Sequence, residues 1–174
     1  MGNINNTMNG KAPSTPRKGG LLTWDELPHW LQDNQFILGN YRGPSYSFKK
    51  SLESLTYLHS ESVNIHTHLW GVVAVILGLW PVLNALSARH ASVTWHDAVA
   101  FGIWFFGAVF CLGMSASYHT VSNHSPNVNA SAQKLDHLGV VIMTAGSFIS
   151  MLYYGWYCEP IFAYAFQAMV SVFE

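Results

Sequence analysis

Residues 69–83 read LWGVVAVILGLWPVL, and this stretch decides the fold class. It lies in a run without Asp, Glu, Lys or Arg between Glu61 and Arg89. A transmembrane helix needs about 20 predominantly apolar residues to cross the hydrocarbon core of a bilayer. The stretch therefore predicts a first membrane span. Pro81 falls near its end, where a membrane helix tolerates proline.

Two further apolar runs of similar length follow, and a shorter one ends the sequence. The second run covers residues 98–118, the third covers residues 137–157, and the fourth starts at Ile161 and continues to Glu174. The fourth falls short of the roughly 17 residues that set the lower limit for a span. Trp and Tyr gather near the ends of the runs, as at membrane surfaces, which disfavours a soluble protein with buried core helices. The sequence thus predicts an all-α, multi-pass transmembrane helix bundle with three complete spans and the start of a fourth.

Composition supports this class and excludes others. Hydrophobic residues make up 50% of the chain and charged residues 10%, against roughly 25% charge in soluble domains. The formal net charge of −1 gives no reason to expect nucleic-acid binding. Both cysteines, Cys111 and Cys158, lie in apolar runs, which indicates small apolar fillers rather than a disulfide framework or a thiolate zinc site.

Three regions follow along the chain. Residues 1–20 are rich in Asn, Gly, Pro and Ser and are predicted to form a disordered tail. Residues 21–60 form a juxtamembrane segment, and residues 61–174 form the partial helix bundle. Within the juxtamembrane segment, residues 24–31 are predicted as a short helix. Phe48, Leu52 and Leu55 have an amphipathic helical spacing beside two lysines, typical either of a helix on the inner membrane surface or of one that packs on protein.

The distribution of Lys and Arg predicts the orientation. On one side of the spans lie Arg42, Lys49, Lys50 and Lys134, and on the other side only Arg89. The positive-inside rule places the N-terminus and the loop between the second and third runs in the cytosol. The plasma membrane and the endoplasmic reticulum remain equally compatible with the sequence.

Three polar residues at the membrane boundary are the candidate site. Ser115 and His119 lie four residues apart near the end of the second span, so they share a helical face. Asp136 lies at the start of the third. Because consecutive spans are antiparallel, these three side chains are expected to converge near the cytosolic boundary. Ionisable groups at this depth are unfavourable unless they serve a function.

A neutral imidazole with a nearby carboxylate suits zinc or another divalent transition metal. A catalytic zinc usually has three protein ligands and a water molecule. The sequence offers His119 as one ligand, Asp136 as a ligand or its partner, and no His-x-x-x-His pair, so a zinc site would be incomplete. His119 as an ordinary helix-end histidine is the alternative. His66 and His68 point to different helix faces and are interpreted as interfacial or packing residues, with Glu61 and His68 able to join helix ends.

Several motifs in one order resemble the progestin and adipoQ receptor family, which includes the adiponectin receptors and the hemolysin III proteins. The resemblance covers roughly residues 24–174, and its lead, LTWDEL at 22–27, is similar to fungal members. The motifs are Glu61-x-x-Asn64-x-x-Thr67-His68-x-x-Gly71, Ser115-x-x-x-His119, and Lys134-Leu135-Asp136 followed by Gly139.

The resemblance implies a seven-helix bundle with a cytosolic N-terminus and a zinc ion near the cytosolic face. It implies His119 as a zinc ligand, with two more from a His-x-x-x-His motif on the last helix. It implies Asp136 beside the zinc, holding a water molecule, and Ser115 as a nearby polar group; Asp136 and Ser115 are the catalytic candidates. Adiponectin receptors are associated with ceramidase activity, and fungal relatives with zinc and lipid homeostasis. Membrane lipids, in particular ceramide or another sphingolipid, are the implied partners, and an extracellular ligand is left unidentified.

The chain departs from this pattern because it ends before helices four to seven and their His-x-x-x-His motif. We therefore interpret it as part of a longer protein and expect zinc-dependent hydrolysis only in the intact parent. Two alternatives stay open: a non-enzymatic membrane receptor with a structural metal site, and an inactive fragment. A pore is disfavoured, because the three spans carry no ring of acidic or basic residues.

Overall fold

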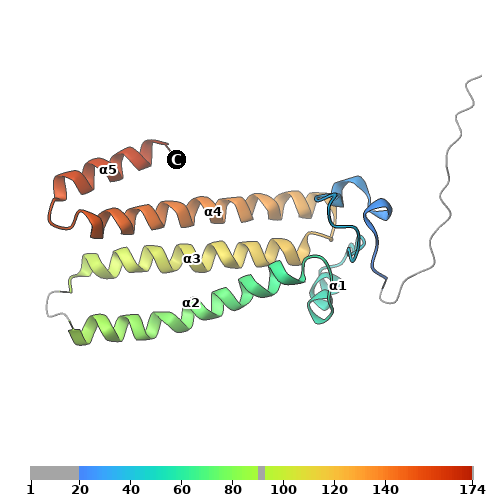
Figure 1. The fold of residues 1–174 in the computed structure, drawn as a ribbon, viewed down its shortest axis with the longest axis horizontal. Helices are drawn as coiled ribbons and strands as arrows, with labels where there is room; N and C mark the ends of the chain where they lie inside the picture. The colour runs from blue at the N-terminus through green and yellow to red at the C-terminus, as the bar shows by residue number, and fades with distance from the viewer. Residues whose placement is uncertain (1–19, 90–92, 174) are drawn as a thin grey trace, which may run out of the picture.

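The computed structural model describes residues 20–89 and 93–173, and Figure 1 shows it as a helical chain. Its elements, in order, are η1 (Trp24–Glu26), η2 (His29–Leu31), α1 (Phe48–Glu53), η3 (Ser54–Thr56), α2 (Ser62–Arg89), α3 (Trp95–Val121), α4 (Pro126–Gly155) and α5 (Pro160–Phe173). Within these two ranges the only β-type pairing is an isolated bridge between Leu22 and Tyr41. The all-α prediction is confirmed. The predicted tail, residues 1–20, lies outside the described residues except for Gly20.

Three helices are long and apolar enough to cross a membrane by length and composition. Their candidate spans are Ser62–Ala85, Trp95–Val121 and Pro126–Gly155. They agree with the three runs predicted from hydropathy. The fourth run forms α5, whose 14 residues are fewer than a span requires.

The helices extend beyond the apolar runs at one end. α3 continues to Val121, so His119 lies in its last turn, and α4 begins at Pro126 rather than near residue 137. Pro126 occupies the first turn, where its fixed φ suits a helix and its missing N–H is not needed. Hydropathy detects only the apolar part of a helix. Asp136 therefore lies inside α4 and not at its start.

The juxtamembrane segment is less regular than its pattern suggests. The predicted helix over residues 24–31 is two single 3-10 turns, η1 and η2, on either side of Pro28, which cannot donate a backbone hydrogen bond. The amphipathic helix is confirmed as α1 but ends at Glu53, and Leu55 lies in η3. Asn64 lies within the first turn of α2 and does not cap it, since this helix begins at Ser62.

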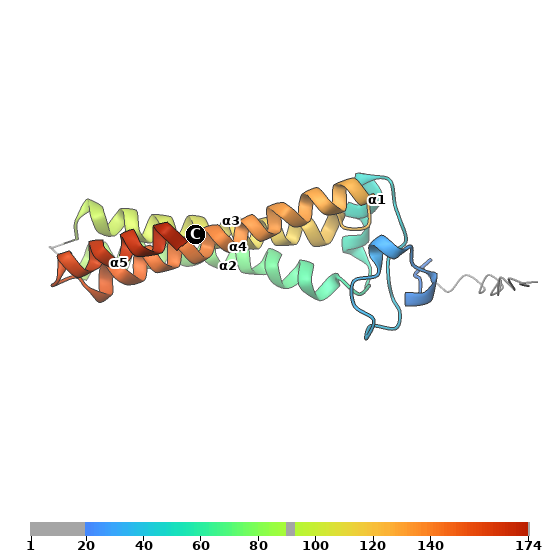
Figure 2. The ribbon, with the colours of Figure 1, turned by 90° about the horizontal axis from the view of Figure 1, so that it is seen from above.

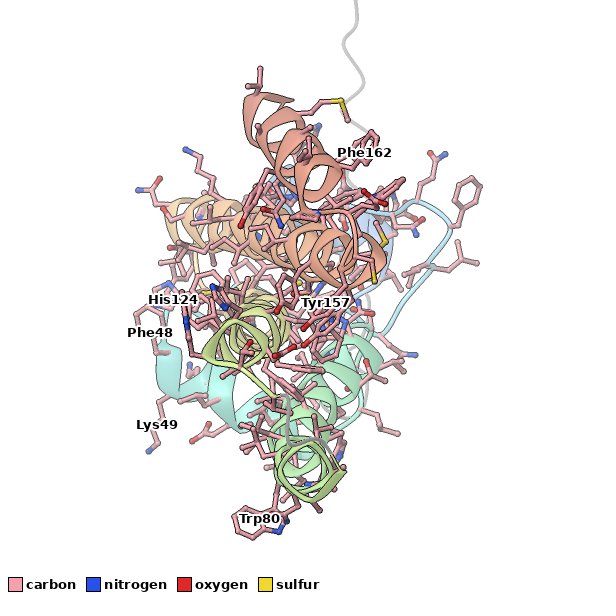
Figure 3. The ribbon with its side chains drawn as sticks, turned by 90° about the vertical axis from the view of Figure 1, so that its left-hand side faces the viewer. Phe48, Lys49, Trp80, His124, Tyr157 and Phe162 are labelled. Atoms are coloured by element: carbon pink, nitrogen blue, oxygen red, sulfur yellow. The ribbon has the colours of Figure 1, made fainter. Side chains whose placement is uncertain are left out.

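The helices α2, α3 and α4 form a single row, with α3 in the middle packed against both neighbours. α5 folds back along α4, and the juxtamembrane segment lies at the opposite end of the row from the α4–α5 turn (Figures 1 and 2). A row cannot enclose its own apolar side chains, so large residues such as Trp70, Leu77 and Trp80 point outward; Figure 3 shows Trp80 at the margin. This arrangement suits lipid, which solvates such side chains.

Small residues bring α3 and α4 into close contact. A Cβ atom on Gly139 would lie 3.0 Å from the Cα of Cys111, and one on Gly146 would lie 3.2 Å from the backbone oxygen of Ile103. Glycine permits this approach, as is common between membrane helices. These contacts fix the antiparallel register of the two helices, in which residue 139 faces residue 111.

Gly139→Ala is expected to destabilise the bundle despite the better helix propensity of alanine, because its Cβ would push α3 away. We expect a loss of about 1–3 kcal/mol, as for other overpacked contacts. The measurement is thermal unfolding in detergent. The matched control is Gly113→Ala on α3, where a Cβ meets nothing within 4 Å. An equal response of both variants would contradict the register.

The end of the row away from the juxtamembrane segment carries a group of aromatic side chains. Thr94 caps α3 through a reciprocal pair with Asp97, whose Oδ2 accepts hydrogen bonds of 2.8 Å from the Thr94 N–H and hydroxyl. The other carboxylate oxygen of Asp97 accepts a 3.0 Å bond from the Tyr154 hydroxyl on α4. Trp95 and Trp156 lie at the same end and are exposed. This placement is typical of aromatic residues at a membrane–water boundary.

Candidate functional site

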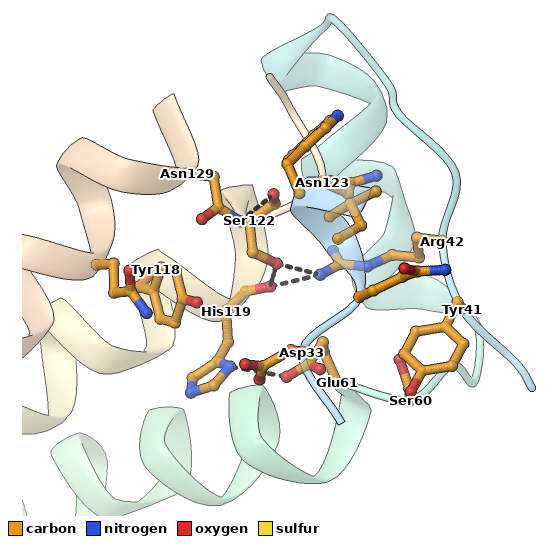
Figure 4. A pocket seen from close by; sticks show the side chains of 14 residues that line it. Asp33, Tyr41, Arg42, Ser60, Glu61, Tyr118, His119, Ser122, Asn123 and Asn129 are labelled. Atoms are coloured by element: carbon orange, nitrogen blue, oxygen red, sulfur yellow. Dashed lines mark hydrogen bonds and ion pairs between the residues drawn. The ribbon is translucent and has the colours of Figure 1, made fainter. Parts of the chain in front are cut away.

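His119 faces α2 from the last turn of α3 and is held there by Glu61. The distance between its Nδ1 and the Oε2 of Glu61 is 2.7 Å, and both side chains are mostly buried. Glu61 immediately precedes α2, so the contact joins the end of one span to the beginning of another (Figure 4).

The charge of Glu61 decides which nitrogen of His119 is free. Burial raises the pKa of Glu61, but hydrogen bonds from His119 and Asn64 and the positive charge of Arg42 outweigh it and lower the pKa below its usual value. The carboxylate is therefore ionised at neutral pH and accepts the Nδ1–H of His119. The Nε2 lone pair remains available. A histidine held through one nitrogen by a carboxylate is the arrangement that metal-binding histidines use.

His68 lies beside His119 on the facing helix. The two rings meet edge to face, with their centroids 6.4 Å apart. The Nδ1 of His68 is buried and has no hydrogen-bond partner among the described residues. An orphaned buried nitrogen is unfavourable unless a ligand or water satisfies it. The ring contact agrees with the interpretation of His68 as a packing residue, and it places the ring beside the candidate site.

Ser115 and His119 lie one helical turn apart on α3, as their spacing requires, and Ser115 is buried. Asp136 lies on α4, where the contact of Gly139 with Cys111 sets it level with the turn that contains Ser115. Asp136 is partly exposed and close enough to act electrostatically on Tyr118. Within residues 20–89 and 93–173, no hydrogen bond joins Ser115 or Asp136 to His119. Asp136 and Ser115 lie at the same level, and His119 lies one turn closer to the juxtamembrane end.

A polar cavity of about 180 Å³ adjoins His119 at the juxtamembrane end. It is lined on one side by the C-terminal end of α3 and the N-terminal end of α4. On the other side it is lined by the turn at Trp30–Asp33 and by Tyr41 and Arg42 (Figure 4). Asp33, Glu61 and Arg42 all line it, so charges of both signs face the cavity. The juxtamembrane segment therefore covers the candidate site and leaves a polar space above it.

Arg42 fixes the end of α3. Its Nη1 donates to the Thr120 carbonyl and its Nη2 to the carbonyl of His119, so the guanidinium caps the last turn. It also donates to the hydroxyls of Ser54 and Ser122. The side chain is only 5% exposed. A cation suits the negative end of a helix dipole, and the bonds set the position of the His119 backbone.

His59, in the turn before α2, makes the same region sensitive to acid. Burial and the positive charge of Arg42 lower its pKa to about 4. In the unfolded chain the pKa of His59 is higher, near 6.5. The contribution of neutral His59 to the stability of the fold is therefore complete above pH 6.5 and is lost as the pH falls towards 4.

At pH 5, protonation linked to His59 is expected to destabilise the fold by about 2 kcal/mol relative to pH 7.5. The measurement is the pH dependence of thermal unfolding for the wild type and for His59→Gln, which cannot titrate. The variant should lose less stability between these pH values. Parallel curves for the two proteins would contradict the lowered pKa.

Comparison with known proteins gives the family. The family model described as Haemolysin-III related matches residues 56–173. The chain belongs to the haemolysin-III related family. The match includes the helices that carry His68, Ser115, His119 and Asp136.

Within this family, curated relatives cover most of the chain. It is 43% identical over 155 residues to "Progestin and adipoQ receptor-like protein 1" of Caenorhabditis elegans, covering 87% of the chain and 34% of the relative. It is 38% identical over 155 residues to "ADIPOR-like receptor IZH2" of Saccharomyces cerevisiae, covering 87% and 47%, and 37% identical over 149 residues to the "Adiponectin receptor protein" of Drosophila melanogaster, covering 86% and 33%. The chain thus spans a third to a half of these relatives, and the family resemblance found in the sequence is confirmed.

The haemolysin-III related helices supply one histidine that suits a metal, but the described residues do not complete a site. Within them, no three His, Cys, Asp or Glu side chains gather closely enough to hold a metal ion. Cys111 and Cys158 are free thiols, and Cys158 is exposed.

Sequence reasoning did not find the contacts of two residues of this region. Arg42 was assigned to the charge bias and to the pre-membrane stretch of the resemblance, because nothing in its sequence context shows that it will cap a helix that ends 79 residues later at Val121. His68 could have been found: Glu61, Asn64 and His68 are spaced i, i+3 and i+7, which places them on one helical face.

Proposed function

We propose that the intact protein is a zinc-dependent hydrolase of lipid amide bonds, with ceramide as the substrate, linked to signalling in lipid and zinc homeostasis. The observation that carries the proposal is the pair His119–Glu61. A 2.7 Å contact with an ionised carboxylate leaves the Nε2 of a half-buried histidine free, next to a polar cavity.

The residues present suit zinc in part. His119 would hold the ion through Nε2, and Glu61 would orient its ring and raise its basicity. The orphaned Nδ1 of His68 indicates that a water or ligand atom belongs beside it. The other ligands would come from parts of the protein outside this chain. Bound zinc would supply a Lewis acid and lower the pKa of a coordinated water towards about 7.

The chain's own residues would do the rest of the chemistry. Asp136 would accept a proton from the attacking water and return it to the leaving amine, so that the amide gives a fatty acid and an amine. Ser115, buried at the same depth, would donate a hydrogen bond to the oxygen that gains charge. His119 would act as a ligand and not as an acid or base.

The row of helices suits a lipid substrate. Its outward apolar side chains would let acyl chains approach from the bilayer, and the cavity over His119 would take polar groups. The excess of Lys and Arg at this end would place the site at the cytosolic leaflet.

Removal of the metal tests this proposal. Ceramide hydrolysis by the purified intact protein is expected to fall to background after chelation and to return with added zinc. Release of fatty acid is the measurement, and magnesium replaces zinc in the control. Hydrolysis that is insensitive to chelation would contradict a zinc-dependent enzyme.

A receptor with a structural metal is the second candidate. The names of the relatives in Saccharomyces cerevisiae and Drosophila melanogaster contain the word receptor. The contact between His119 and Glu61 ties α2 to α3, which is a structural role that needs no chemistry. In that case the metal would be retained and the intact protein would show no lipid turnover.

A further inference from the structure

The short helix α1 turns its serine side to the protein, and its two large apolar side chains stay more than half exposed, although the ring of Phe48 also stacks on His124 with the centroids 4.2 Å apart. Ser51 and Ser54 are fully buried. Ser51 donates a 2.8 Å hydrogen bond to Asn123, and Ser54 accepts one of the same length from Arg42. Phe48 and Leu52, in contrast, are 55% and 56% exposed. In a helix on the surface of a water-soluble protein, the apolar side chains would face the core.

The exposed side chains are arranged by helical spacing. Phe48 and Leu52 lie four residues apart and share one face of α1. Lys50 lies two residues from each and points away from that face. Lys49 lies beside the face, and its side chain is almost fully exposed. The helix thus has a serine side against the protein, an apolar side, and a charged side on which Lys49 lies next to the apolar face and 3.9 Å from Glu53.

The position of α1 identifies what the apolar side meets. α1 lies beside the end of α3, shortly before the first membrane span begins at Ser62. Figure 3 shows Phe48 and Lys49 at the margin of the molecule, on the outer side of the row of helices. The link to α2 adds Leu58, which is 84% exposed. Apolar and basic side chains therefore lie together at the level of the membrane surface.

We propose that α1 docks on the surface of the bilayer at the juxtamembrane end of the spans. Phe48 and Leu52 enter the boundary between headgroups and acyl chains, and Lys49, beside them, pairs with acidic phospholipid headgroups. Apolar residues next to lysines are typical of interfacial helices. Such helices bind acidic membranes both through the burial of apolar side chains and through electrostatic attraction to the lipids. This inference does not depend on zinc or on hydrolysis.

The docking surface connects to the candidate site through hydrogen bonds. Ser54 of η3 bonds to Arg42, and Arg42 bonds to the carbonyl of His119. A shift of α1 on the membrane would therefore move the groups that hold the end of α3.

Spin labels on α1 test the docking. The intact protein, with Cys111→Ala and Cys158→Ala, is labelled at Leu52→Cys or, as the matched control, at Lys50→Cys, and is placed in nanodiscs. We expect the label at 52 to collide several-fold more often with oxygen, which enters the bilayer, than with a nickel chelate, which stays in water. The label at 50 should show the reverse.

The other outcomes overturn the proposal. A label at 52 that meets the nickel chelate freely places α1 in water. A label at 52 that is immobile and reached by neither reagent means that another part of the protein covers this face. Replacing phosphatidylcholine by a mixture with phosphatidylserine should deepen the label at 52, and Lys49→Gln should abolish that shift. A depth independent of phosphatidylserine would contradict the pairing with acidic headgroups.

Discussion

Asp136→Asn in the intact protein is expected to lower ceramide turnover by about 100- to 10,000-fold, the range for loss of a general base. The amide has the size and polarity of the carboxylate but cannot take a proton from water. The side chain lies on α4 at the depth of Ser115, and its removal leaves the contact between His119 and Glu61 in place. Zinc content should therefore stay at the wild-type level. The measurements are release of fatty acid and metal analysis of the same samples.

Two further variants separate loss of the general base from loss of the metal and from a general effect of substitution. His119→Ala should lose both zinc and turnover, because it removes a ligand. Glu159→Gln, in the turn at the far end of the row, should change neither. Wild-type turnover in Asp136→Asn would end the proposed role of this carboxylate. Zinc retention without turnover in the wild-type protein itself would favour the receptor.

Arg42→Ala is expected to cause the largest loss of stability in the juxtamembrane segment, about 3 kcal/mol or more in the free energy of unfolding. The guanidinium bonds to the backbone carbonyls of His119 and Thr120 and to two hydroxyls. Its removal takes the donor from the buried Thr120 carbonyl, leaves the His119 carbonyl only the 3.1 Å bond from the Ser122 hydroxyl, and breaks two bonds to hydroxyls. An unsatisfied buried acceptor is unfavourable by about 1–3 kcal/mol. Thermal unfolding in detergent and the reactivity of the partly buried Cys111 thiol are the measurements.

Two other substitutions separate geometry from charge. Arg42→Lys keeps the cation but replaces a planar fork by a single ammonium, so we expect only partial recovery. Lys49→Ala removes an exposed cation of the same segment, 3.9 Å from Glu53, and should change stability by less than about 1 kcal/mol. Equal effects of Arg42→Ala and Lys49→Ala would show that the buried bonds of Arg42 do not hold the segment.

Most of the architecture follows from local patterns. The three uncharged runs predict the three long helices, because a span is defined by its own length and apolarity. Their ends are less predictable. Pro126 starts α4 well before the apolar run, since a polar sequence with proline in its first turn also forms helix in water. For the same reason Asp136, expected at a helix start, lies within α4.

The candidate site was predicted in its parts but not in its contacts. The spacing of Ser115 and His119 gives their shared face, and the antiparallel order of the spans gives Asp136 its depth. The partner of His119, however, is Glu61, which is 58 residues away in the sequence. The position of His68 against His119 also depends on the rotation of α2 about its axis, which packing against α3 decides.

The sequence by itself determined that this chain is a helical membrane protein of the haemolysin-III related family, and which polar residues lie at the end of its spans. Apolarity, helical period and motif order are properties of neighbouring residues, so they can be read without coordinates. Only the tertiary structure decided that Glu61 holds His119, that Arg42 holds the end of α3, and that α1 turns its apolar side outward. These features depend on the rotation and register of separate segments, which close contacts such as Gly139 against Cys111 fix.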